Sequence, residues 1–187
     1  TYLLPFYRNE PQKQKFFTDE WQHLNNSASS YINQLPNDSY VQYYLNLRVL
    51  IANFSLFSNR YFDRLPELEK NFNDLNFADE RLVQSGLYTE LLDAYVLAME
   101  SYGDNQYTHL NAGIDAIIAS LKTQPTLAQN ITEYLFNVLE RRSLYKSSEH
   151  LALAMLSNEN CQLDDKHKAL FEQYRKMANG QIAPNII

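Results

Sequence analysis

The stretch YVQYYLNLRVLIANFSLF, residues 40–57, decides the fold of this 187-residue chain. Its apolar residues recur every three or four positions, which is the spacing of one face of an α-helix. Further apolar residues, among them Val41, Leu45 and Val49, widen that face nearly all round. A helix that is apolar on most sides is covered by several neighbours. The stretch therefore predicts a central, buried helix.

Stripes of apolar residues at the same spacing flank this helix and predict about eight or nine helices with no convincing strand. The chain holds only 4 glycines and 6 prolines, which are too few turn residues for an all-β sandwich or barrel. The connections are short, so successive helices should pack antiparallel. We predict an all-α fold, an irregular stack of helical hairpins over residues 1–180, with a short extended tail over residues 181–187.

Several residues mark the expected helix boundaries. Pro36 predicts the end of a second short helix before it, because a proline ring clashes with the preceding helical turn. Gly103 stands where a left-handed C-cap would end a helix over residues 91–102. N-cap candidates, whose side chains accept a bond from a free N–H, are Asn37, Asp38 or Ser39 for the stretch quoted above, and Ser147 or Ser148 for a later helix.

A weak internal repeat supports the stack of hairpins. The tetrapeptide TELL at residues 89–92 resembles TEYL at residues 132–135, and THL at 108–110 resembles EHL at 149–151. The two offsets, close to 40 residues, fit one helical hairpin per repeat. With two copies and few matches, an irregular stack is favoured over a regular solenoid.

The composition excludes several classes of protein. The formal net charge is −6, which disfavours a nucleic-acid partner because phosphate binding needs a dense basic face. The single cysteine, Cys161, excludes a disulfide framework, a cysteine zinc cluster and a Cys-x-x-Cys pair within the chain. The most apolar stretch, residues 40–57, is interrupted by Asn46, Arg48 and Asn53, so no membrane span is expected.

Candidate chemical sites are few, and each has a simpler interpretation. Glu20-x-x-His23 has the spacing of di-iron bundles, but a second such motif is missing, which favours a solvated helix face. His109 and His150 border apolar stripes and are expected to be ordinary hydrogen-bonded residues. Cys161 has acidic neighbours and is expected to be buried and inert. We therefore predict no catalytic, cofactor-binding or metal-binding residue and no cofactor.

The aromatic residues, 14 Tyr, 10 Phe and 1 Trp, belong mostly to the apolar stripes and are expected in the core. Trp21 and Tyr61 are the candidates for an interaction surface. A groove lined by exposed tyrosines would favour a scaffold that binds a protein or peptide. A helical enzyme with a pocket around Glu20, His23 and Arg48 is a further alternative.

The run FEQYRKMANGQIAPNI, residues 171–186, resembles a known domain junction. It is similar to the segment before the thioredoxin-like domain in secreted thiol–disulfide oxidoreductases of Gram-negative bacteria, in the peroxiredoxin and cytochrome-maturation thioredoxin group. A Gly-x-x-Ala-Pro-Asp-Ile/Phe segment opens the redox domain there. Gly180, Ala183, Pro184 and Ile186 match it, whereas Asn185 stands where Asp is usual. Upstream, residues 84–87, 134–140 and 148–152 and Cys161 resemble the helical domain of some of these proteins.

The resemblance implies a function that the residues of this chain do not carry themselves. Residues 1–180 would be a non-catalytic helical accessory domain, and residues 181–187 would begin a thioredoxin-like domain whose Cys-x-x-Cys pair lies beyond Ile187. The implied partners are that domain, a protein substrate or a second copy of the chain. The implied location is the periplasm or the outer membrane. The alternative is a free-standing helical scaffold for a protein or peptide partner.

Overall fold

A computed structural model describes residues 11–57, 64–157 and 165–177, and everything described is helix or short connection, with no strand among these residues. The all-α prediction is confirmed. The helices are α1 (Pro11–Ile32), α2 (Tyr40–Phe57), α3 (Leu65–Asn73), α4 (Glu80–Ser85), α5 (Tyr88–Met99), the 3-10 helix η3 (Glu100–Asn105), α6 (Gln106–Ser120), α7 (Pro125–Arg141), α8 (Tyr145–Ser157) and α9 (Asp165–Met177).

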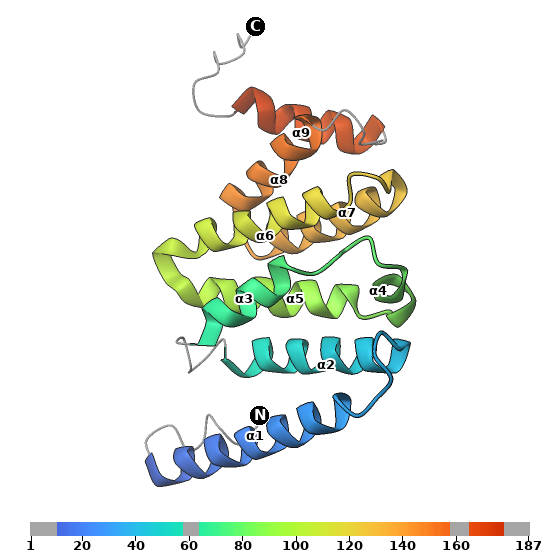
Figure 1. The fold of residues 1–187 in the computed structure, drawn as a ribbon. Coiled ribbons are helices and arrows are strands. Elements are labelled where there is room, and N and C mark those ends of the chain that lie inside the picture. The colour runs from blue at the N-terminus through green and yellow to red at the C-terminus, as the bar shows by residue number, and fades with distance from the viewer. Residues whose placement is uncertain (1–10, 58–63, 158–164, 178–187) are drawn as a thin grey trace, which may run out of the picture.

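The helices form two layers of a stack (Figure 1). One layer holds α2, α5 and α7, and the other holds α3, α6 and α8. Successive helices alternate between the layers, so that α2–α3, α5–α6 and α7–α8 are hairpins. At the ends of the stack α1 packs on α2, and α9 packs on α8. The short helices α4 and η3 interrupt the alternation, which makes the stack irregular, as predicted.

The repeat of about 40 residues reappears as side-chain contacts between neighbouring helices of one layer. Arg48 of α2 binds Glu90 of α5, 42 residues further on. Tyr134 and Arg142 of α7 bind residues of α5 and η3 that precede them by 41 and 42 residues. Because these offsets stay constant along the helices, α2, α5 and α7 run parallel (Figure 1).

The helix α2 packs against α1, α3, α4 and α5, so it has several neighbours as predicted. Its burial is less complete than predicted, because Val41 is 53 % exposed. Among its described side chains, only these are buried: Leu47, Leu50, Ile51 and Phe54.

In the core, three aromatic rings from α2, α3 and α5 are in contact. The ring of Tyr95 stacks on Phe72 with 3.7 Å between centroids, and Phe54 meets both rings edge to face. All three side chains are buried. Edge-to-face and stacked aromatic pairs stabilise a core beyond the area that they bury.

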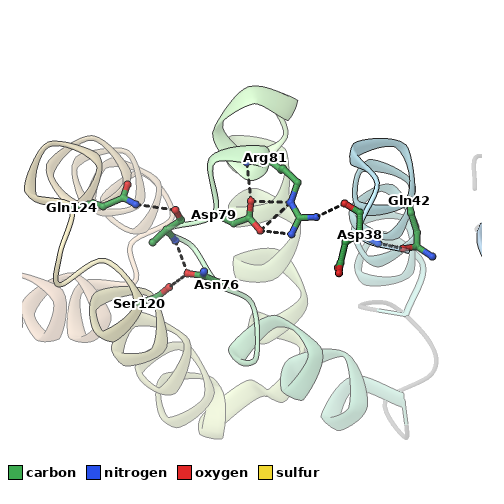
Figure 2. A network of polar contacts seen from close by, with 8 residues as sticks. Asp38, Gln42, Asn76, Asp79, Arg81, Ser120 and Gln124 are labelled. Atoms are coloured by element: carbon green, nitrogen blue, oxygen red, sulfur yellow. Dashed lines mark hydrogen bonds and ion pairs between the residues drawn. The ribbon is translucent and has the colours of Figure 1, made fainter. Parts of the chain in front are cut away.

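Polar contacts join the connections between helices at one end of the stack (Figure 2). Ser39 is the N-cap of α2, because its hydroxyl accepts the N–H of Gln42 at 3.2 Å. The side-chain amide of Gln42 donates to the last carbonyl of α1, at Ile32. A serine with glutamine three residues later is a typical start of a helix. Of the three predicted N-caps of α2, Ser39 is the one used.

Two further contacts join connections that are far apart in sequence, and the second of them, made by Gln124, is drawn in Figure 2. Phe77, between α3 and α4, donates its N–H to the hydroxyl of Ser120 at the end of α6, at 2.7 Å. Gln124, which precedes α7, donates its amide to the carbonyl of Ala78 at 2.9 Å. These bonds satisfy backbone N–H and C=O groups in the connections. Burying such groups without a hydrogen-bond partner would destabilise the fold.

The first and fourth helices differ from the prediction. Residues 11–32 form one continuous helix where two were expected, because no proline or glycine stands between Pro11 and Pro36 to break it. Leu24, which shares an apolar helical face with Phe17 and Trp21 in the sequence, is 53 % exposed. The six-residue α4 was not predicted, because it buries only Leu82 and shows no stripe.

Two predicted caps are wrong. Gly103 has a positive φ of 59°, but its ψ of −122° is not left-handed helical, and it lies inside η3 after α5 has ended at Met99. Ser147 and Ser148 do not cap α8, which already begins at Tyr145. Both serines are buried inside its first turn, where Ser147 donates to Asn111 and Ser148 donates to Glu140.

Some predicted features lie outside the described residues. These are the extended tail with its Gly180–Ile186 motif, the cysteine at position 161, and Tyr61.

Candidate functional site

A pocket of about 530 Å³ opens between the parallel helices α2, α5 and α7. Its apolar floor is formed by Ile51 of α2, Ala94 and Leu97 of α5, and Val138 of α7. Leu97, in the last turn of α5, is 42 % exposed, whereas Ile51, Ala94 and Val138 are buried. The volume lies within the usual range of ligand sites, which is roughly 300–1,000 Å³.

The side chains around this floor, which we call the charged rim, alternate in sign and are held by ion pairs. Glu90 of α5 accepts from Arg48 of α2 at 2.8 Å. Arg142 binds Glu100 through two nitrogens, with Nε donating to Oε1 at 2.9 Å. This bidentate bond raises the pKa of Arg142 above its ordinary value. A guanidinium fork on a carboxylate is a strong, directional contact, so Arg142 and Glu100 join the end of α7 to η3.

Tyr134 lies between two further rim residues, Asp93 and Arg141. Tyr134 of α7 donates its hydroxyl proton to Asp93 of α5 at 2.9 Å. Burial first, and then the bond to Asp93, raise the pKa of Tyr134. Arg141, beside it, donates Nε to the carbonyl of Asn137 in the last turn of α7, at 3.3 Å. A cation at this position also complements the helix dipole.

A groove lined by exposed tyrosines would have favoured a scaffold, but the lining of this pocket is aliphatic and charged apart from Ser55. Another pocket, of about 510 Å³, lies between α4 and the first turn of α7 and includes Val83 and Leu127. Val83 is 41 % exposed, nearly the same fraction as Leu97. The second pocket is lined by a six-residue helix and a helix start, whereas the first spans three long parallel helices. We therefore take the pocket between α2, α5 and α7 as the candidate site.

The histidines expected at stripe boundaries each bond to a carboxylate. His109 of α6 lies with Nδ1 2.9 Å from both carboxylate oxygens of Glu69 on α3. The ring of Tyr102 stacks on its imidazole at 3.6 Å, and burial raises the pKa of Tyr102 to about 12. His150 of α8 lies 2.8 Å from Asp115 of α6. Both pairs join neighbouring helices of the second layer.

The residues suggested for a helical enzyme do not come together. Glu20 and His23 are exposed on α1, whereas Arg48 lies on α2 and binds Glu90 of α5. Within the described parts of the chain, no three His, Cys, Asp or Glu side chains are grouped as a metal site would require. Trp21 is partly buried and packs against the edge of the core. An interaction role for Trp21 and Tyr61 stays a prediction.

Comparisons with protein-family models, with curated proteins and with solved structures find no match to this chain. None of the helices that the structure describes combines the length and the apolar character needed to cross a bilayer. The fold and the pocket are therefore the observations on which a function can be argued.

Sequence reasoning missed the pocket but noted some of its parts. Glu90 lies in the repeated tetrapeptide TELL, and Arg141 and Arg142 form an adjacent basic pair in the sequence. A usable signal was present in the repeat. Residues of opposite charge stand 42 positions apart, at Arg48 with Glu90 and at Glu100 with Arg142. Leu97 also carried a signal, because it lies outside the predicted apolar stripe and at helical spacing with Glu90 and Asp93.

Proposed function

We propose that this protein is a helical-hairpin scaffold that binds a protein partner in the pocket between α2, α5 and α7. The observation that carries the proposal is the solvent-facing apolar floor at Leu97, enclosed by a rim of ion-paired side chains. Anchor side chains in desolvated pockets supply most of the affinity of protein interfaces. An apolar floor inside a polar rim is the arrangement that such an interface needs.

The hydrogen bonds that the rim carboxylates already make favour a binding function over a catalytic one. Glu90 and Glu100 accept from guanidinium groups, and Asp93 accepts from a tyrosine hydroxyl. A general base must have a lone pair aimed at the substrate proton, and these bonds direct the carboxylates toward α2 and α7 instead. The arginines likewise hold the helices in register. The rim therefore serves as a rigid frame around the floor.

The test is selection of ligands from a random dodecapeptide library on phage, with the whole chain as bait. We expect peptides that bind the wild-type chain and lose at least about tenfold in affinity on Leu97→Glu, which places a charge on the floor. The matched control is Val83→Glu, an equally exposed apolar residue at the other pocket. Peptides that bind both variants equally, or that are lost only on Val83→Glu, would contradict the proposed site.

A second candidate function follows from the sequence alone. The Gly180, Ala183, Pro184 and Ile186 motif supports a helical accessory domain of a secreted thioredoxin-like oxidoreductase, located in the periplasm or at the outer membrane. In that case the pocket would bind the redox domain or its protein substrate. The coding sequence after Ile187 tests this directly. A Cys-x-x-Cys motif is expected there, and a stop codon immediately after Ile187 would contradict the proposal.

A further inference from the structure

A further pocket, of about 310 Å³, lies between α2 and α3, and its described lining contains no charged residue. Its polar lining residues are Tyr43, Asn46 and Asn53 of α2 and Asn71 of α3. Both pockets described above have charged side chains in their lining, so this one differs from them in chemistry. Its volume is at the lower end of the usual range of ligand sites, roughly 300–1,000 Å³.

The rest of the lining is aliphatic. Leu47 and Leu50 of α2 and Leu68 of α3 are buried. Val49 of α2 and Leu75, which follows α3, are only partly buried and leave apolar surface for a ligand to cover. Covering apolar surface stabilises a complex roughly in proportion to its area, so the pocket favours a ligand with an aliphatic body.

Two oxygen atoms of the lining residues are buried with no hydrogen-bond partner among the residues that the structure describes. They are the hydroxyl oxygen of Tyr43 and Oδ1 of Asn53. Burial raises the pKa of Tyr43 to about 12, so its hydroxyl keeps the proton and lacks an acceptor. Oδ1 of Asn53 lacks a donor. Because buried polar groups without a partner destabilise a fold, two of them at one pocket point to a bound molecule that supplies the missing bonds.

The positions of these two residues set the shape of that molecule. Tyr43 and Asn53 are ten positions apart on one helix, so their Cα atoms are about 15 Å apart along its axis. Both side chains line the pocket and are only partly buried, and rotation about their side-chain bonds can turn the two oxygens toward it. A ligand that binds both is elongated, with an acceptor at the Tyr43 end and a donor at the Asn53 end.

The lining also decides the charge of the ligand. A charged group in the pocket would lose hydration and find only uncharged partners in the lining, which costs much more free energy than burying a neutral polar group. The guanidinium of Arg81 lies 4.5 Å from the ring centre of Tyr43, but it already binds the Asp79 carboxylate at 2.7 Å.

From these features we infer that the pocket between α2 and α3 binds a neutral, elongated aliphatic molecule with a hydrogen-bonding group at each end. Aliphatic diols and hydroxyamides have this chemistry. The site shares no lining residue with the pocket between α2, α5 and α7, so the inference is independent of the proposed function.

The experiment titrates 1,8-octanediol into the whole ¹⁵N-labelled chain and follows the backbone amide resonances. We expect saturable shifts in α2 and α3. Suberate and 1,8-diaminooctane have the same chain length but charged ends, and each should bind at least about tenfold more weakly. The shorter 1,4-butanediol cannot reach both oxygens and should be weaker by a similar factor, about tenfold.

Two variants remove the unpartnered oxygens and keep the side chains similar in size. Tyr43→Phe and Asn53→Leu should each weaken octanediol binding about fivefold or more. Neither should lower the urea midpoint of the unliganded chain, because the lost oxygens have no partner in the described fold. Tyr40→Phe is the matched control, since Tyr40 is an exposed tyrosine on the same helix, and it should change neither quantity.

Each other result would overturn the inference. Absence of saturable shifts in α2 and α3 would exclude the site. Equal binding of suberate or diaminooctane would exclude a neutral ligand. Unchanged octanediol affinity in both variants would show that ordered water, rather than a ligand, satisfies the two oxygens.

Discussion

A close contact between a glycine and a tyrosine shows how one residue fixes the spacing of two helices. Tyr95 of α5 stacks on Phe72 and donates its hydroxyl to the carbonyl of His109 on α6, at 2.7 Å. A Cβ atom at Gly113 of α6 would lie only 2.2 Å from the Tyr95 hydroxyl oxygen. Tyr95 and its stacking partner Phe72 are buried, so the tyrosine ring has little room to move away. Gly113 is therefore required by packing, in spite of its poor helix propensity.

We expect Gly113→Ala to lower the free energy of unfolding by about 1–3 kcal/mol, the range for overpacked cores. Helix propensity acts the other way, because alanine is more favourable than glycine inside a helix by about 1 kcal/mol. Urea denaturation followed by circular dichroism measures the net effect. The control is Ala112→Gly at the exposed neighbouring position, which reports the propensity in the same helix. A more stable Gly113→Ala variant would show that the contact does not constrain the packing.

The sequence predicts such residues only in part. The apolar spacing correctly placed Tyr95 on a buried stripe, because spacing reflects burial directly. It could not assign a role to Gly113, since the reason for the glycine lies 18 positions earlier on another helix. Leu97 at the pocket is a different case, because it is an apolar residue that is exposed. It stands at helical spacing with Glu90 and Asp93, so it lies on the exposed, polar face of α5.

At the scale of elements, α4 shows how a helix forms without an apolar stripe. Asp79 is its N-cap and accepts the N–H of Arg81 at 2.9 Å, and Gly86 ends it in the left-handed conformation. The guanidinium of Arg81 binds the Asp79 carboxylate, donates to the carbonyl of Asp38, and lies 4.5 Å from the ring centre of Tyr43 (Figure 2). The helix is thus held by its two ends and by one arginine that reaches α2.

This arrangement predicts a dependence of stability on pH. The hydrogen bond from Arg81 lowers the pKa of Asp79 below its ordinary value. A carboxyl whose pKa is lowered by folding stabilises the protein above the pKa of the unfolded chain, about 3.9, and loses that effect as the pH falls through its folded pKa. We expect Asp79→Asn, which keeps an N-cap side chain, to be less stable than wild type by about 1–2 kcal/mol at neutral pH.

The measurement is the free energy of unfolding in urea for both proteins from neutral pH to about pH 2. The difference between them should stay constant down to the ordinary carboxyl range and then shrink toward zero. Two curves that run parallel over the whole range would show that the charge of Asp79 does not stabilise the fold. Asp104→Asn is a matched control, because Asp104 is an exposed aspartate in η3.

The contacts between elements show which features of the fold the sequence could not predict. The contact of α2 with several neighbours was predictable from its apolar residues, although the spacing overestimated how much of the helix is buried. The contacts that align the elements are not local. Phe77 with Ser120, and Ala78 with Gln124, are separated by 43 and 46 residues. These are backbone-to-side-chain bonds, which leave no mark on the spacing of apolar residues.

At the scale of the whole molecule, a stack of hairpins is held together by contacts between neighbours. The helix α5 is the centre, since it packs against α2, α3, α4, α6, α7 and η3. At one end, α9 packs on α8 and reaches α7 through the rings of Phe171 and Phe136, 5.0 Å apart. Stability in such a stack is roughly the sum of each unit and its interfaces with neighbours. Local opening should therefore cost most in α5 and least at the ends.

Native-state hydrogen exchange tests this order. We expect the slowest-exchanging amides in α5 and in the parts of α2 and α6 that cover it, with faster exchange in α9. Phe171→Ala, which empties a buried position by the loss of a whole ring, should speed exchange in α9 and α8 and leave α2 and α5 nearly unchanged.

Leu92→Ala in α5 is the counterpart. Because every other unit depends on α5, it should speed exchange throughout the stack. If Phe171→Ala instead sped exchange equally in α9 and α2, the stack would open as a single cooperative unit. The pocket would then be no more rigid than the ends of the molecule.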